Sequence, residues 1–211
     1  MMHKTFTTLT LGFIISLTAL QSMATTTSDL ERDWAIANYQ TETATKADTF
    51  ERLIDQAEAA LATQPENAEL LIWTAIIKST YAGVSGGLPA LSLVKSARTH
   101  LEDAMEIDDM ALQGSAYTSL GALYYKVPGW PLGFGSDKQA RKMLEKAVSI
   151  NPEGIDPNYF YAEFLVQQKK YDDARQRLNK AMAATARPGR EVAEAGRRAE
   201  IHTLLEKIKG M

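Results

Sequence analysis

The sequence predicts an all-α protein built from repeated helix pairs. Alanine-rich segments place apolar residues three and four positions apart along most of the chain, and alternating β-branched runs are scarce. One spacing recurs, in which a small or apolar residue is followed by a second four positions on and by an alanine three further. The four occurrences are Leu53, Ala57, Ala60; Ala97, Leu101, Ala104; Ala140, Leu144, Ala147; and Ala174, Leu178, Ala181. Because such a seam lets neighbouring helices approach closely at alanine, its recurrence indicates a repeated unit.

Residues 1–24 are expected to be a secretory signal peptide. Lys4 precedes the largely apolar run 9–20, and Ser22-Met23-Ala24 supplies small residues for cleavage after Ala24. An uncleaved N-terminal anchor is the alternative, and no second candidate membrane span follows. The chain has no cysteine, which excludes disulfides and a lipid attached to a cysteine at the cleavage site. The expected location is therefore periplasmic or secreted.

The exported part is expected to contain three regions. Residues 25–47 hold a helix over 30–39 and then a linker, and the repeat domain covers 48–186. The capping boxes Asp48–Glu51 and Ser136–Gln139 mark helix starts, as does Asp156 before a proline. Residues 187–211 follow the break Arg187-Pro188-Gly189 and predict a capping helix, because an apolar stripe runs along an otherwise charged segment.

The repeat resembles the tetratricopeptide repeat family. The alanines that end the four seams are separated by 44, 43 and 34 residues, and the last interval is the period of that family. The family's pattern of aromatic, leucine, glycine, aromatic and closing proline matches Tyr117, Leu120, Gly121, Tyr124 and Pro152. The next unit has Tyr161, Ala162, Leu165 and Tyr171, with Lys169 at the turn glycine; the first full unit is looser, with Leu71, Thr74, Ala75 and, for the proline, Asp109. The resemblance implies a right-handed solenoid of about three helix pairs between N-terminal and C-terminal capping helices.

Two units are longer than the family period. About ten extra residues fall in the first full unit and about seven after Tyr124, and both are expected as loops on one edge of the solenoid. The second loop contains prolines that bar helix continuation, glycines that permit positive φ, and the apolar Trp130, Leu132 and Phe134. These three side chains are expected to pack on their own repeat, or else to contact a partner or ligand.

Catalytic and metal motifs are weak. Gly83-Val84-Ser85-Gly86-Gly87 fits the nucleophile-elbow pattern and Ser92-Leu93-Val94-Lys95 fits an acylation motif, but the first lies after a predicted helix and the second lacks its partner motifs. Gly133-Phe134-Gly135 lacks the remainder of a phosphate loop. We expect no catalytic residue, no metal and no cofactor, since two isolated histidines after export do not form a zinc pattern. A serine-dependent enzyme is the third functional alternative.

Binding is the expected function. In the resembling family the first helix of each pair lines a concave groove, which implies a partner surface at Ile72, Ile76, Thr118, Tyr125, Lys126, Tyr159 and Glu163. Tyr125 and Tyr159 are expected as exposed aromatics at this surface, the alternative being core packing. The leading hypothesis is an adaptor or assembly factor for a protein partner in the cell envelope. The alternative is an accessory protein of a solute transporter that closes its two loops over a small apolar ligand. The charge gives no indication of nucleic acid; its unevenness favours homo-oligomers with head-to-tail contacts, or merely solvated faces.

Overall fold

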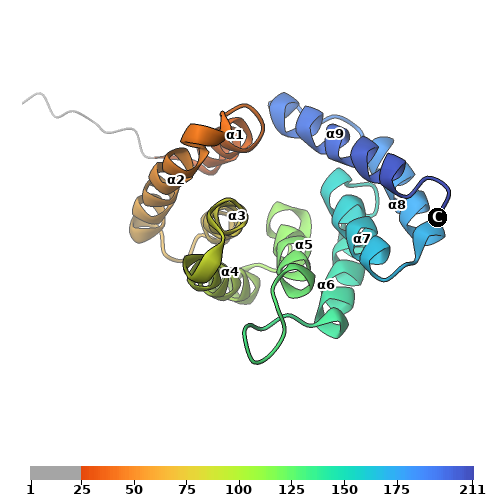
Figure 1. Ribbon diagram of the computed structural model, residues 1–211. Helices are drawn as coiled ribbons and strands as arrows, with labels where there is room; N and C mark the ends of the chain where they lie inside the picture. Colours follow the sequence, from red (N-terminus) through yellow and green to blue (C-terminus); the bar gives the residue numbers. More distant parts are fainter. Residues whose placement is uncertain (1–24) are drawn as a thin grey trace, which may run out of the picture.

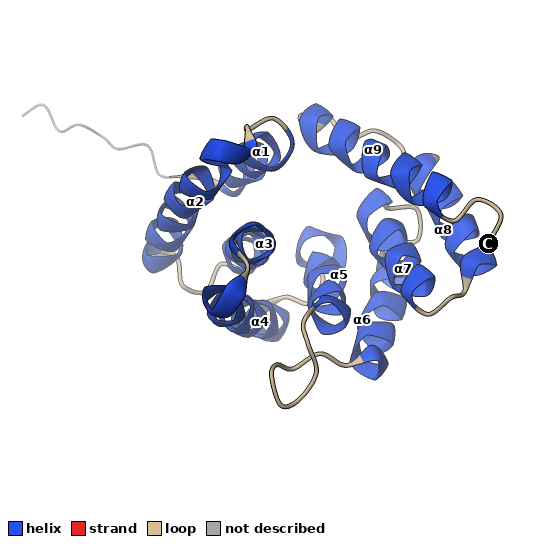
Figure 2. Ribbon diagram, in the orientation of Figure 1, coloured by secondary structure: helices blue, strands red, loops and turns tan. Residues whose placement is uncertain are grey.

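The computed structural model describes residues 25–211, so the predicted signal peptide lies outside the described residues. This part consists of helices joined by loops, without strands (Figure 2). The helices are α1 (Thr27–Tyr39), α2 (Thr43–Thr63), α3 (Ala68–Ser85), α4 (Gly87–Ile107), α5 (Ala111–Lys126), α6 (Asp137–Ile150), α7 (Ile155–Gln167), α8 (Tyr171–Met182) and α9 (Glu191–Lys207). The all-α prediction is confirmed. In α5 the regular helix starts at Ser115, because residues 112–114 have left-handed backbone angles.

The helices form a solenoid of pairs (Figure 1). α3 packs with α4, α5 with α6, and α7 with α8, and the second helix of each pair also contacts the first helix of the next pair. α1 and α2 add a pair at the N-terminus. The first helices contact one another in the order α1, α3, α5, α7, so they form one continuous side of the solenoid.

The repeated seam accounts for this packing. Ala97, Leu101, Ala140 and Leu144 are fully buried, as their spacing predicts. Gly121 lets α5 and α6 approach each other closely, since a Cβ at this position would lie 2.7 Å from Cγ of Leu144. The glycine of the repeat pattern is therefore required where α5 meets α6.

Helix starts follow the predicted caps only in part. Ser136 caps α6, where its hydroxyl accepts from the Gln139 amide at 3.4 Å. The cap expected at Asp48 is wrong, because α2 begins at Thr43 and so includes most of the predicted linker. α7 begins at Ile155, one residue before Asp156. The Asp156 carboxylate therefore lies within the first turn and is available to other partners.

The two extra segments differ in structure. In the first full unit the added residues lengthen α3 to 18 and α4 to 21 residues, and Gly86, which has a positive φ of 64°, is the single residue between them. The expectation of a loop at this position is therefore wrong. The second insertion is a loop over residues 127–136, which includes a cis Trp130-Pro131 peptide bond (Figure 2).

The C-terminal helix closes the row of helices back onto α1. α9 contacts α8 and α7 and then α1, so the first and last helices lie side by side (Figure 1). At this contact the Tyr39 ring lies against Gly196, where even one methyl group would meet the ring closer than 3.0 Å. We call this contact the α1–α9 closure.

Candidate functional site

The predicted groove residues lie on the first helices, but most are covered. Ile72, Thr118, Tyr125 and Tyr159 are buried, and Ile76 is half-buried. The expectation that the two tyrosines are exposed aromatics is wrong, because neighbouring helices and α9 pack on them. Whether they contact a partner stays a prediction.

Tyr125, Lys126 and Glu163 form a polar link between α5 and α7. The Tyr125 hydroxyl donates to Oε2 of Glu163 at 2.5 Å, and Nζ of Lys126 lies 2.7 Å from the same oxygen. Burial and the adjacent Glu163 carboxylate raise the pKa of Tyr125 well above its ordinary value, so its hydroxyl stays protonated. The predicted residues are thus brought together, in an interaction that holds two repeats at a defined spacing.

Arg197 of α9 inserts beside Tyr159. Its guanidinium lies 4.4 Å from the centre of the Tyr159 ring and 4.6 Å from that of Phe160, and its Nε donates to Asp156 at 3.0 Å. Burial alone would raise the pKa of Asp156, but Arg197 and Arg187 outweigh it and lower that pKa. The carboxylate therefore remains charged and fixes α9 on α7.

Other arginines extend this network to α1 and α3. Arg187 donates to Asp156 at 3.1 Å and to the buried Glu194 at 2.7 Å. Arg190 pairs with Glu31 of α1 and lies over the Trp73 ring of α3, 5.7 Å from its centre. This role was not predicted, because the C-terminal arginines were interpreted only as charge asymmetry. The signal in the sequence was their position in the segment that leads into the covering helix, downstream of an acid at Asp156.

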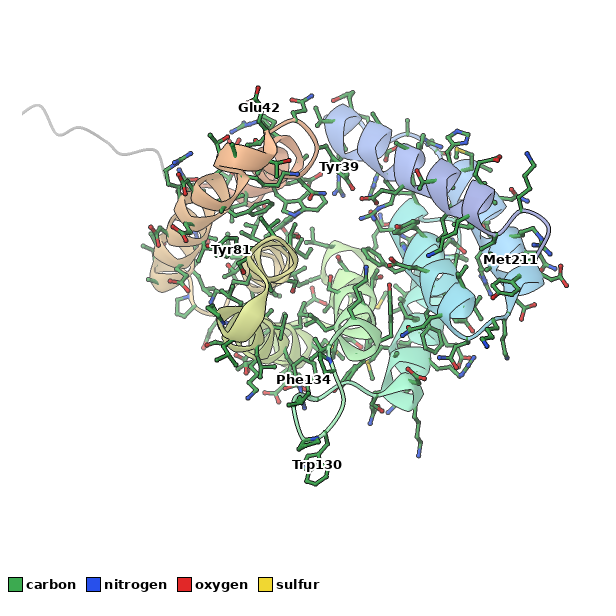
Figure 3. The ribbon with its side chains drawn as sticks, viewed as in Figure 1. Tyr39, Glu42, Tyr81, Trp130, Phe134 and Met211 are labelled. Carbon is green, nitrogen blue, oxygen red and sulfur yellow. The ribbon has the colours of Figure 1, made fainter. Side chains whose placement is uncertain are left out.

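The α1–α9 closure leaves a cavity of about 610 Å³, which we call the α9 groove. Tyr39 and Gln40 from the end of α1 and Tyr159 from α7 line part of it. The wall contributed by α9 consists of Val192, Ala195, Gly196, Ala199, Glu200, Thr203, Leu204 and Lys207. Figure 3 shows Tyr39 between α1 and α9.

The Tyr39 hydroxyl is a buried polar group beside the α9 groove. The Glu200 carboxylate of α9 lies near its oxygen, although the geometry falls short of a regular hydrogen bond. Burial raises the pKa of Tyr39 to about 12, so the hydroxyl is a neutral donor near pH 7. The hydroxyl therefore belongs to the α1–α9 contact, because its oxygen has no surface that a bound group could reach.

The loop over residues 127–136 has a packed base and an exposed tip. Phe134 meets the Tyr124 ring edge-on at 5.8 Å, with the Arg98 guanidinium 5.2 Å from the Phe134 centre. Trp130 is 90% exposed and Leu132 70% exposed, and Trp130 points away from the helices (Figure 3). The expectation of packing on the same repeat is right for Phe134 and wrong for Trp130 and Leu132.

The glycines of this loop have a structural role. The amide of Gly135 donates to the Pro128 carbonyl at 2.9 Å, and a Cβ on Gly133 or Gly135 would fall inside contact distance of the opposing backbone. The Gly133-Phe134-Gly135 sequence therefore closes the base of the loop.

The other short motifs lie on helices. Ser85 ends α3, and Ser92 and Lys95 lie exposed on α4. His100 is within 3.1 Å of Nζ of Lys78, and burial together with that ammonium lowers its pKa. In the part of the chain that the structure describes, no three potential metal ligands lie together, and no helix is both long and apolar enough to span a bilayer.

Comparison with known proteins agrees with the helix-pair architecture. Residues 138–208 match the family model described as tetratricopeptide repeat, a range that runs from α6 through α9. A search of curated proteins finds no match. Repeats of this family are generally non-catalytic scaffolds for protein–protein interaction. Residues 138–208 are thus similar to tetratricopeptide repeats, and the helix pairs that precede them stack in the same paired manner.

Proposed function

We propose that the chain is an adaptor or assembly factor of the cell envelope, which binds a short segment of a protein partner in the α9 groove. The repeat family supports a protein partner, and the N-terminal signal pattern supports export to the periplasm. The observation that carries the proposal is the α9 groove itself, a cavity of about 610 Å³ with a largely apolar wall on α9.

The α9 groove is open to a partner, whereas most of the predicted groove residues are covered. Tyr125 and Tyr159 are covered, and the polar atoms of Lys126 and Glu163 are paired with each other. The groove in contrast combines apolar side chains with the ammonium of Lys207, and its volume is typical of binding sites. A partner segment with an apolar side chain beside a carboxylate or a backbone carbonyl would use these groups together.

A variant whose groove is filled by a larger side chain tests this proposal. Ala199 is an exposed residue of the groove wall, so Ala199→Trp fills the groove without disturbing the core. Ala59→Trp on the exposed face of α2 is the matched control. The partner is identified by crosslinking and mass spectrometry in the native host, then purified for a binding titration. We expect at least ten-fold weaker binding for Ala199→Trp and unchanged binding for Ala59→Trp. Equal affinity for both variants would exclude the groove as the partner site.

A small apolar ligand of a transport accessory protein is the second candidate, favoured by the volume and apolar wall of the same groove. The earlier expectation of two loops closing over it does not apply, because the first full unit has no such loop. Native mass spectrometry of protein from its own host distinguishes the candidates. A retained small molecule that Ala199→Trp abolishes supports the ligand, and a stoichiometric protein complex supports the adaptor.

A further inference from the structure

Two neighbouring repeats present exposed apolar tips at the same edge of the solenoid. Leu88, at the α3–α4 connection, is 87% exposed, and Trp130 and Leu132 are at the tip of the α5–α6 loop. Both connections lead from the first to the second helix of a pair, so stacked pairs place them on one edge. Arg98 of α4 lies over Phe134, which confirms that the loop base is beside α4.

Both tips extend beyond the helix ends of the next repeat. Ala97 of α4 and Ala140 of α6 occupy equivalent positions in the seam. Ten residues of α4 precede Ala97, whereas three residues of α6 precede Ala140. Seven extra residues at 1.5 Å each extend the α3–α4 connection by about 10 Å. In the second pair the loop over 127–136 provides the extension.

This edge is rich in basic residues in an acidic protein. Residues 79–101 and 124–142 together contain six Lys or Arg and one acid, Asp137, whereas the whole chain has a formal net charge of −3. Three of the six pair with acids outside these ranges: Arg98 with Glu102, Lys126 with Glu163 and Arg141 with Glu145. The α7–α8 connection on the same edge adds the exposed Lys169 and Lys170, followed in the first turn of α8 by the exposed Asp172 and Asp173, of which Asp172 pairs with Arg175. Among the described residues, these two lysines and the exposed Lys138 form no salt bridge that would neutralise them.

We propose that this edge docks on the surface of an anionic phospholipid bilayer, with Trp130, Leu132 and Leu88 inserted at the interface. Tryptophan is enriched at bilayer interfaces, and lysines near the surface are attracted to anionic headgroups. Separate apolar tips surrounded by lysines fit a lipid surface, which admits each tip independently, better than one pocket of a protein. This surface is distinct from the α9 groove and does not depend on the function proposed for it.

Tryptophan fluorescence of the full chain tests the proposal. Trp34 and Trp73 are buried, so Trp130 is the tryptophan of the described chain that a bilayer can reach. With vesicles of equal parts phosphatidylglycerol and phosphatidylcholine we expect a blue shift of the emission and quenching by brominated acyl chains. Trp130→Phe should remove both effects. Every variant keeps the same N-terminal residues, so any contribution from them cancels in the comparison.

Vesicle co-sedimentation tests the other residues. We expect Leu88→Ser combined with Trp130→Ser to weaken binding at least ten-fold, whereas Ile107→Ser, an exposed apolar residue at the other end of α4, leaves it unchanged. Lys138→Gln, Lys169→Gln and Lys170→Gln should each weaken it about five-fold, and only with the anionic lipid. Ala199→Trp should have no effect, which separates this edge from the groove.

Two results would overturn the proposal. The first is an unchanged Trp130 emission at vesicle concentrations that saturate a membrane-binding control protein. The second is capture of a protein in cells by a photo-crosslinker at position 130, together with no binding of the purified chain to vesicles. The edge would then be a protein interface.

Discussion

Adding one methyl group at Gly196 should weaken the α1–α9 closure. A Cβ at this position would lie closer than 3.0 Å to ring atoms of Tyr39, so α9 would have to move away from α1 by about 1 Å to regain ordinary contact. Overpacking of this kind costs about 1–3 kcal/mol. Replacing a helical glycine by alanine contributes up to about 1 kcal/mol in the opposite direction.

A matched glycine separates the two effects. Gly83 is also helical, and nothing lies within 4 Å of the position its Cβ would occupy. In urea denaturation we expect Gly83→Ala to stabilise the protein and Gly196→Ala to be about 1–3 kcal/mol less stable than Gly83→Ala. In a Tyr39→Ala background the penalty should disappear. If Gly196→Ala stabilises the wild-type protein as much as Gly83→Ala does, Tyr39 does not lie on α9.

Three further variants test the network, the loop and the seam. Asp156→Asn should cost about 1–3 kcal/mol in unfolding free energy. Because the folded pKa of Asp156 lies below its ordinary 3.8, that difference should be full at pH 5 and shrink as the pH falls through the folded value. Phe134→Ala should cost about 2–3 kcal/mol and Trp130→Ala less than about 0.5 kcal/mol in the same assay, since only Phe134 is packed. Leu144→Ala should lower the unfolding free energy by about 2–5 kcal/mol, because this seam residue is fully buried.

Local spacing was sufficient to predict the repeat. The seam at Ala140 and Leu144 and the glycine at Gly121 determine how close α5 and α6 lie, and both are visible as sequence periodicity. The extra residues around Gly86 were predicted as a loop, because length alone does not distinguish a loop from two longer helices. Their apolar spacing continues the helical pattern on both sides of Gly86.

The groove could not be predicted from a single repeat. Its walls come from Tyr39 and Ala199, about 160 residues apart, and their approach depends on how far the whole solenoid curls. The family resemblance implied an open concave face, which is why Tyr125 and Tyr159 were expected to be exposed. The long C-terminal helix, held by Arg197 on Asp156, covers that face instead.

A distance between the end of α1 and the C-terminal half of α9 tests the α1–α9 closure most directly. The sequence contains no cysteine, so Gln40→Cys and Thr203→Cys provide two spin-label sites without background, and both residues are exposed at the α9 groove. Pulsed electron paramagnetic resonance of the doubly labelled chain should give one narrow distribution at the short end of the measurable range. A broad or long distribution would show an open solenoid and would contradict the closure and the groove together.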